Sequence, residues 1–256
     1  MSLKHIIKEM QSYIESLDKE AIRAKILFFL FIQLQEHYFS IVKTFKKKDF
    51  INTMIISRTF IEGAINILYI ATASNQEIVK IDRYNKIRRL RQEHRAKTIN
   101  DASIQFVSNG IFDINKLSDN PLFEGFLDKK GRVIRNYPNK SIHQKCEYIG
   151  KQLKGKTDAI LGFALMYYED LSEITHNSYH GYVLTFGMHR LTKKKYSTRD
   201  MKKHIYKYQT GYSSNLFLLL SMLLLQIEKG INFQYGNQEY EKRIKQRINK
   251  MKGMDT

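Results

Sequence analysis

The sequence of 256 residues is poor in residues that interrupt helices, with only two prolines, Pro121 and Pro138, and 13 glycines. Lysine, leucine, isoleucine and glutamine, which helices tolerate well, are frequent between them. The hydrophobic fraction of 43% is ample for a core. We therefore predict an all-α protein in which residues 1–256 form a single helical domain.

The sequence also lacks the cysteines that a disulfide or a cysteine-based zinc site requires, because Cys146 is the only one. The first twenty residues are amphipathic rather than continuously apolar, so no signal peptide is visible. The most apolar run, residues 216–225, is about half the ~20 residues that a membrane span needs. We expect a cytoplasmic protein, with contact to a membrane as the less favoured alternative.

Both prolines and three of the glycines, Gly110, Gly125 and Gly131, fall between residues 99 and 140. This composition is typical of loops and short helices, so we predict an irregular cap or insertion there. Elsewhere, apolar residues recur every three or four positions, as in amphipathic helices. The predicted helices cover residues 3–17, 21–45, 50–73, 74–98, 141–150 and 161–182, a segment that opens at 197 or 198, and residues 213–229 and 239–252.

The net charge of +18 is concentrated in three segments. Residues 80–97 hold eight basic and two acidic residues, residues 189–207 eight and one, and residues 241–252 six and one. Concentrated positive charge favours a polyanionic partner, RNA or DNA before an anionic membrane. The alternative is that these segments are solvated helix faces of a lysine-rich protein.

The stretch Leu161–Tyr182 is an apolar helix whose face turns polar. Tyr168, Ser172 and His176 follow one another at intervals of four residues, so they share one side of the helix. Buried polar groups need partners, and several on one face indicate a structural or chemical role.

The predicted helix at residues 50–73 carries Arg58 and Glu62 inside its apolar stripe. Their spacing lets the two side chains pair. An ion pair on a buried face costs several kcal/mol of desolvation per ion unless other polar groups assist. We therefore predict that Arg58 contacts the polar face of the Leu161 helix.

Two interpretations of this constellation stay open. In the first, His176 is a general acid or base, Arg58 binds or stabilises an anionic group, and Ser172 and Tyr168 orient the others. In the second, the same residues form a buried hydrogen-bond network that fixes how two helices pack.

The stretches SRTFIEGAINILYI and YYEDLSEITHNSYH resemble a family of bacterial helical proteins of unassigned function, in turn similar to the HEPN superfamily. The resemblance matches Arg58, Glu62, Ser172 and His176 and covers roughly residues 25–225. It implies a HEPN-like helical bundle, often dimeric, and a metal-independent ribonuclease acting as a toxin or antiphage effector, with an antitoxin protein as a possible partner.

The sequence departs from the HEPN ribonuclease signature, an arginine followed after four to six residues by histidine on the same helix. His176 has no arginine at that spacing, because Glu169, Asp170 and Leu171 stand there. The spacing does occur at Arg88 or Arg89 with His94 and at Arg199 with His204. The departure leaves open which pair would act and puts catalysis, but not the fold, in question.

Basic residues near these pairs are our candidates for binding nucleic acid, and the tyrosines at 196, 206 and 208 are available for stacking on bases. The candidates are Arg88, Arg89, Arg91, Lys193, Lys194, Lys195, Arg199, Lys202 and Lys203. The alternative is that they are solvated surface residues.

His176 and His180 have the spacing at which two histidines can bind one metal, with Glu173 nearby, but no HExxH-type pattern is present. The sequence GKQLKGKTD lacks the spacing of a phosphate-binding P-loop and follows no predicted strand. We predict neither a metal nor another cofactor. The overall expectation is an RNA-cleaving or RNA-binding protein, and the alternative is a non-catalytic helical module that binds nucleic acid or a partner protein.

Overall fold

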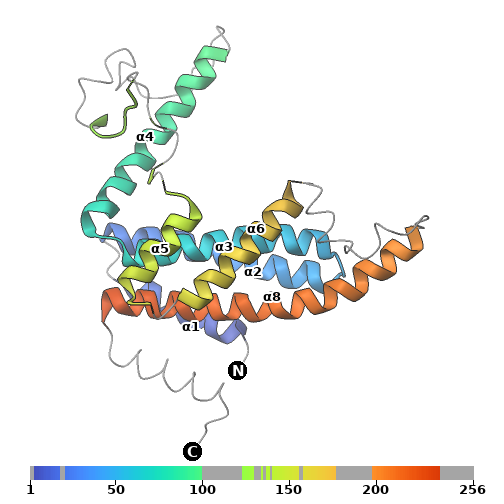
Figure 1. The fold of residues 1–256 in the computed structure, drawn as a ribbon. Helices are drawn as coiled ribbons and strands as arrows, with labels where there is room; N and C mark the ends of the chain where they lie inside the picture. The colour runs from blue at the N-terminus through green and yellow to red at the C-terminus, as the bar shows by residue number, and fades with distance from the viewer. Residues whose placement is uncertain are drawn as a thin grey trace, which may run out of the picture. The chain divides into compact units, whose positions relative to one another are not determined.

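The computed structural model describes residues 3–17, 21–99, 123–129, 134, 137–138, 140–155, 158–176 and 198–236. These residues form seven helices and no β-strand, which confirms the predicted all-α class (Figure 1). The helices are α1 (Leu3–Ser16), α2 (Ile22–Lys46), α3 (Phe50–Thr72), α4 (Asn75–Ile99), α5 (Ile142–Gln152), α6 (Asp158–Thr175) and α8 (Thr198–Tyr235).

The chain divides into two compact units, Met1–Thr72 with Ile142–Thr256, and Ala73–Ser141. The predicted insertion at residues 99–140 falls within the second unit, which starts earlier because it includes α4. The chain between Asn100 and Leu122 lies outside the described residues. The single-domain organisation stays a prediction.

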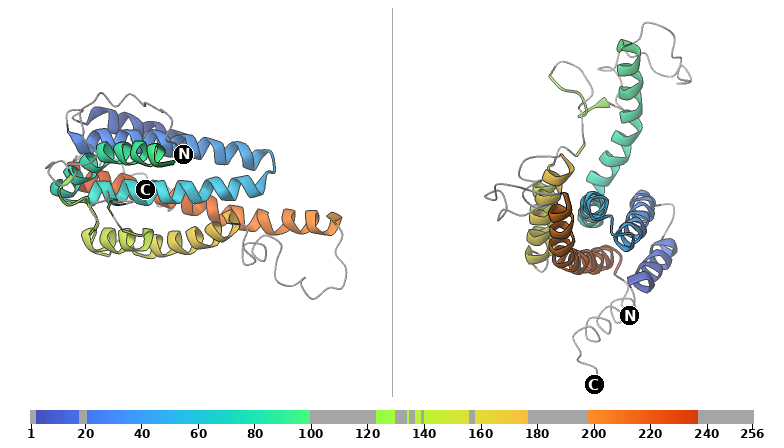
Figure 2. Two further views of the ribbon diagram at one scale, coloured as in Figure 1. Left: turned by 90° about the horizontal axis from the view of Figure 1, so that it is seen from above. Right: turned by 90° about the vertical axis from the view of Figure 1, so that its right-hand side faces the viewer.

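Helix α3 is the centre of the first unit and packs against α2, α5, α6 and α8. Its sequence explains this position, because nine of the twelve residues from Phe60 to Ala71 are hydrophobic and buried. A helix that is apolar on most of its circumference is stable only when other helices cover it. Figure 2 (right) looks roughly along these helices and shows them gathered as a bundle.

Gly230 permits one of the closest approaches in this bundle. A Cβ atom at this position would lie 2.9 Å from Leu68 Cδ2 on α3. Glycine therefore lets the α8 backbone come close to α3, and the leucines of the apolar run then fill the remaining space. Those leucines include Leu216, Leu220, Leu223 and Leu224, all buried.

The sequence predicted two separate helices where the structure has one, α8. The prediction of a separate helix at residues 213–229 is wrong. A glycine within a helix, such as Gly211, costs only about 1 kcal/mol relative to alanine, and the buried leucines that follow hold the helix against α3. The predicted helix at residues 239–252 lies outside the described part of the chain.

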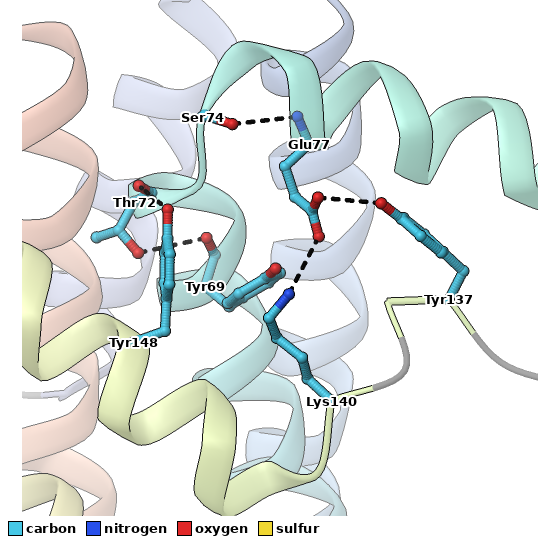
Figure 3. Close-up of polar contacts among 7 residues, drawn as sticks. All are labelled: Tyr69, Thr72, Ser74, Glu77, Tyr137, Lys140 and Tyr148. Carbon is cyan, nitrogen blue, oxygen red and sulfur yellow. Dashed lines mark hydrogen bonds and ion pairs between the residues drawn. The ribbon is translucent and has the colours of Figure 1, made fainter. Parts of the chain in front are cut away.

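The second unit has a small aromatic core of its own. Tyr84 and Ile87 of α4 pack against Phe123 and Phe126, with Tyr137 at the edge. The α4 carboxylate of Glu77 accepts a hydrogen bond from the Tyr137 hydroxyl at 3.0 Å and pairs with Lys140 at 3.5 Å (Figure 3). These two contacts tie the C-terminal end of the irregular segment to the first turn of α4.

Among the described residues, α3 is the one helix long and apolar enough to cross a membrane by length and composition. In its most apolar window 61% of the residues are buried inside the protein, as in the core helix of a bundle. This is weak evidence of a membrane span, since a buried core helix passes the same test. The cytoplasmic location stays a prediction.

Candidate functional site

The candidate site lies where α3 packs against α6, within the first unit. Ser57 and Ile61 on α3 and Leu161, Ala164 and Leu171 on α6 are buried. Arg58 comes directly after Ser57 and therefore stands at the edge of the buried face. Its side chain is 23% exposed, and that of Glu62, one turn later, is 38% exposed. The sequence placed the pair inside the apolar stripe, whereas both are only half-buried.

The guanidinium of Arg58 is bound by side chains from the other helix. Its Nε donates a 2.8 Å hydrogen bond to Ser172 Oγ, and its Nη2 donates one of 2.8 Å to Tyr168 Oη. The predicted contact between Arg58 and the polar face of the Leu161 helix is therefore confirmed. It joins residues more than a hundred positions apart in the chain, so it fixes the register of α3 against α6.

Two further contacts complete the environment of this guanidinium. Nη1 of Arg58 lies 3.4 Å from Glu62 Oε2, and the Arg58 Cζ atom lies 4.8 Å from the centre of the Tyr168 ring. All three guanidinium nitrogens therefore have an internal partner. Because arginine carries five N–H groups, two of them remain available to another acceptor.

Tyr168 stays protonated at neutral pH. Desolvation by burial is the main cause that raises the pKa of its hydroxyl, and the neighbouring carboxylate of Glu62 raises it further. The positive charge of Arg58 and a hydrogen bond with Ser172 oppose this. A neutral hydroxyl can donate to a carboxylate while it accepts from the guanidinium. Tyr168 is therefore an orienting group between Arg58 and Glu62.

His176 is exposed and follows the last residue of α6. Its backbone N–H donates to the Ser172 carbonyl at 2.9 Å, which continues the helical turn. Among the residues that the structure describes, no hydrogen bond or ion pair joins His176 to Arg58. The sequence expected the helix to extend to Tyr182, but α6 ends at Thr175 and residues 177–182 lie outside the described part.

The structure describes few of the predicted nucleic-acid-binding side chains. Arg88 is exposed on α4, in the second unit. Arg89 and Arg91 also belong to α4, and Arg199, Lys202 and Lys203 to α8, but their side chains lie outside the described part, as do those of His94 and His204. Lys193, Lys194 and Lys195 lie wholly outside it.

In the described ranges, no group of three or more His, Cys, Asp or Glu residues is placed to hold a metal ion. His180, the proposed companion of His176, is outside these ranges. The chemistry that the described site can provide is therefore that of its own side chains: a cation, a carboxylate, two hydroxyls and a nearby imidazole.

A second arginine, Arg23, was not singled out in the sequence. Its side chain is 6% exposed, and its Nη1 donates to the carbonyls of Ile70 at 2.9 Å and Ala71 at 3.1 Å. Burial lowers its pKa. Nearby, the Tyr148 hydroxyl lies 3.5 Å from the carbonyl of Thr72, to which it donates (Figure 3). These bonds satisfy carbonyls in the last turn of α3, which lack partners within the helix.

A pattern in the sequence could have shown that Arg23 is a buried residue that needs a polar partner. It stands four residues before Leu27 and so heads the buried stripe of α2, which continues through Phe31, Leu34 and Tyr38. A charged residue at a core position needs a polar partner, and helix-end carbonyls are one source.

A model of a family of unknown function, DUF5677, matches residues 24–195. Because this match spans well over half of the chain, the protein belongs to that family. The matched residues include Arg58, Glu62, Tyr168, Ser172 and His176. Neither the curated proteins nor the solved structures contain a match to the chain.

Proposed function

We propose that this protein is a HEPN-like RNA-binding protein that cleaves RNA without a metal, at the site formed by Arg58, Glu62 and His176. One observation carries the proposal. Arg58, Glu62, Tyr168 and Ser172 converge from two helices on a half-exposed position, and an exposed histidine lies one helical turn further on. The net charge of +18 supports an RNA partner.

RNA cleavage can use a carboxylate, an imidazole and a guanidinium such as those of Glu62, His176 and Arg58. A base removes the proton of the 2′-hydroxyl, the oxygen attacks the adjacent phosphorus, and an acid protonates the departing 5′-oxygen. Glu62 is the base, because its carboxylate is the more exposed partner of the ion pair. His176 is the acid, and the two remaining N–H groups of Arg58 bind the phosphate oxygens. Tyr168 and Ser172 hold the guanidinium in place.

The test uses the full-length protein and 5′-labelled single-stranded RNA in the presence of EDTA. We expect cleavage to products with a 2′,3′-cyclic phosphate, and a loss of about 100-fold or more in rate for Glu62→Gln and for His176→Asn. His143→Asn is the matched control, because His143 is an exposed histidine of α5 that pairs with Glu147 at 3.6 Å. It should cleave RNA at the wild-type rate.

Thermal unfolding of each variant separates a chemical role from a structural one. If His176→Asn cleaves RNA as fast as the wild type, or if its loss of activity follows a loss of folding, the assignment of His176 is wrong. The toxin or antiphage role is tested in a bacterial host. There, expression of the wild type should arrest growth and His176→Asn should not.

A second candidate is a non-catalytic helical module that binds nucleic acid or a partner protein. The observation that favours it is that every nitrogen of the Arg58 guanidinium already has an internal partner. This candidate predicts RNA binding by fluorescence anisotropy, weakened by salt, with no cleavage by the wild type.

A further inference from the structure

The row of polar residues on α3 continues one turn beyond Glu62. Arg58, Glu62 and Asn66 follow one another at intervals of four residues, so they lie along one side of this helix. All three are half-buried. Helices α5 and α6 both pack against α3 (Figure 1). Arg58 at one end of the row contacts α6, and Asn66 at the other end contacts α5.

The contact at Asn66 comes from a lysine of α5. Lys145 Nζ donates a 2.7 Å hydrogen bond to Asn66 Oδ1. The same ammonium lies 5.9 Å from the centre of the Tyr69 ring, within the range in which a cation is attracted to an aromatic face. Tyr69 is 2% exposed and stands three residues after Asn66. These two contacts hold the positive charge of Lys145 beside the Asn66 amide.

This hydrogen bond fixes which way the Asn66 amide points. An ammonium has only donors, so the amide oxygen, and not the amide nitrogen, must face Lys145. The nitrogen with its two N–H groups therefore points away from Lys145. Within the part of the chain that the structure describes, Asn66 makes no other hydrogen bond. Its two N–H groups can donate to a ligand that carries acceptor atoms.

The charges on both sides of Glu62 indicate the class of that ligand. Arg58 precedes Glu62 by one turn, and Asn66, with the ammonium of Lys145 beside it, follows by one turn. Arg58 and Asn66 are about 12 Å apart along the helix axis, at 1.5 Å per residue. Two positive positions in a row suit a ligand with several anionic groups, and a nucleic-acid strand carries a phosphate at every nucleotide.

We propose that Asn66 binds a second phosphate of the RNA strand, on the other side of Glu62 from the phosphate that Arg58 binds. The amide N–H groups donate to the phosphate oxygens. Lys145 is a positioning residue that orients the amide and adds positive charge. The inference rests on the proposed function, because it takes RNA as the ligand of Arg58 and Glu62, and it directs the strand along α3 towards α5.

The first experiment measures binding without cleavage. The full-length protein is titrated into a fluorescein-labelled RNA hexanucleotide whose 2′-oxygens are methylated and cannot attack the phosphorus, and fluorescence anisotropy gives the Kd. Asn66→Asp should raise the Kd about tenfold or more, because a carboxylate still accepts from Lys145 but donates nothing and repels a phosphate. Lys145→Met should also raise the Kd and reduce the salt dependence by about one phosphate contact. Lys145→Arg should restore both.

The matched control is Gln33→Glu, which makes the same change of an amide to a carboxylate at an exposed position of α2. It should bind the hexanucleotide as the wild type does. Asn66→Asp should unfold at the wild-type temperature or above, since it keeps the contact with Lys145. If Asn66→Asp binds as tightly as the wild type, or if Gln33→Glu weakens binding equally, the proposal is wrong.

The second experiment compares cleavage of a dinucleotide, which has one phosphate, with cleavage of an unmodified hexanucleotide. Asn66→Ala should raise the KM for the hexanucleotide about tenfold with an unchanged kcat, and should cleave the dinucleotide as the wild type does. Equal effects on both substrates, or no effect on either, would overturn this inference alone. A wild type that binds RNA but does not cleave it would overturn the proposed cleavage, and the Kd values would then decide on Asn66. A wild type that binds no RNA would overturn both.

Discussion

Two arginines connect helix α3 to its neighbours, Arg23 from α2 and Arg58 to α6, and they are bound in different ways. Arg23 is buried and donates to backbone carbonyls of Ile70 and Ala71 at the end of α3. Arg58 is half-buried and donates to the side chains of Ser172 and Tyr168 on α6. One arginine completes a helix end, and the other joins two helices through side chains.

This difference indicates which arginine can take part in chemistry. Backbone carbonyls at a helix end are fixed and need a donor in every state of the folded protein, so Arg23 is a structural residue. Hydroxyl and carboxylate groups around Arg58 can rotate, donate or accept, and solvent reaches them. A guanidinium in that setting can exchange an internal partner for a phosphate oxygen.

The largest expected effect is on stability and comes from Arg23. Arg23→Met should lower the free energy of unfolding by about 3 kcal/mol, because it leaves two buried carbonyls without this donor. Urea denaturation followed by circular dichroism measures the change. Arg23→Lys should recover only part of the loss, since an ammonium cannot reproduce the planar fork of the guanidinium. A loss below about 1 kcal/mol for Arg23→Met would show that water replaces the arginine.

A smaller loss of stability is expected at the half-buried arginine, Arg58. Arg58→Met should cost about 1 kcal/mol, because solvent can reach the hydroxyls that it leaves. In a double-mutant cycle, Arg58→Met and Ser172→Ala should couple by about 0.5–1 kcal/mol. The control cycle mutates Thr175 in place of Ser172. The Thr175 hydroxyl donates to the Leu171 carbonyl of its own helix at 2.7 Å and does not contact Arg58. Equal coupling in both cycles would contradict the described contact.

The smallest effect concerns alkaline pH. The folded protein raises the pKa of Tyr168 above its ordinary value of 10.0, mainly through burial. The stability that this hydroxyl contributes is therefore complete below pH 10 and is lost as the pH rises through the raised pKa. Unfolding free energies measured at several pH values between 9 and 11 should fall less steeply for Tyr168→Phe than for the wild type. If stability falls equally steeply with pH in Tyr168→Phe and the wild type, the Tyr168 hydroxyl has the same pKa in the folded and unfolded protein.

Local sequence patterns predicted most of the helices and the partners of Arg58. The periodicity of apolar residues predicted α1 to α6 to within a few residues at most ends, because amphipathic helices show their buried face in the sequence. The spacing of Tyr168 and Ser172 placed both on one side of α6, and the position of Arg58 in an apolar stripe predicted a polar partner. That partner proved to be these two residues.

Other features depended on contacts between distant segments. The sequence predicted two helices where α8 is continuous, and the buried leucines of α8 support one helix packed against α3. The half-exposure of Arg58 and Glu62, and the position of His176 beyond the last turn of α6, also follow from how the helices meet. Neither the partial exposure of Arg58 and Glu62 nor the position of His176 can be predicted from residue spacing alone.

The sequence by itself therefore determined the all-α class, the bounds of most helices and the pairing of Arg58 with the polar side of α6. Hydrophobic periodicity and the cost of burying an unpaired charge are properties of short stretches. Only the tertiary structure decided that Arg23 closes the end of α3 and that Phe163 and Leu218 stay exposed. Those outcomes depend on which surfaces of α2, α3, α6 and α8 meet, and that is set by the packing of the whole bundle.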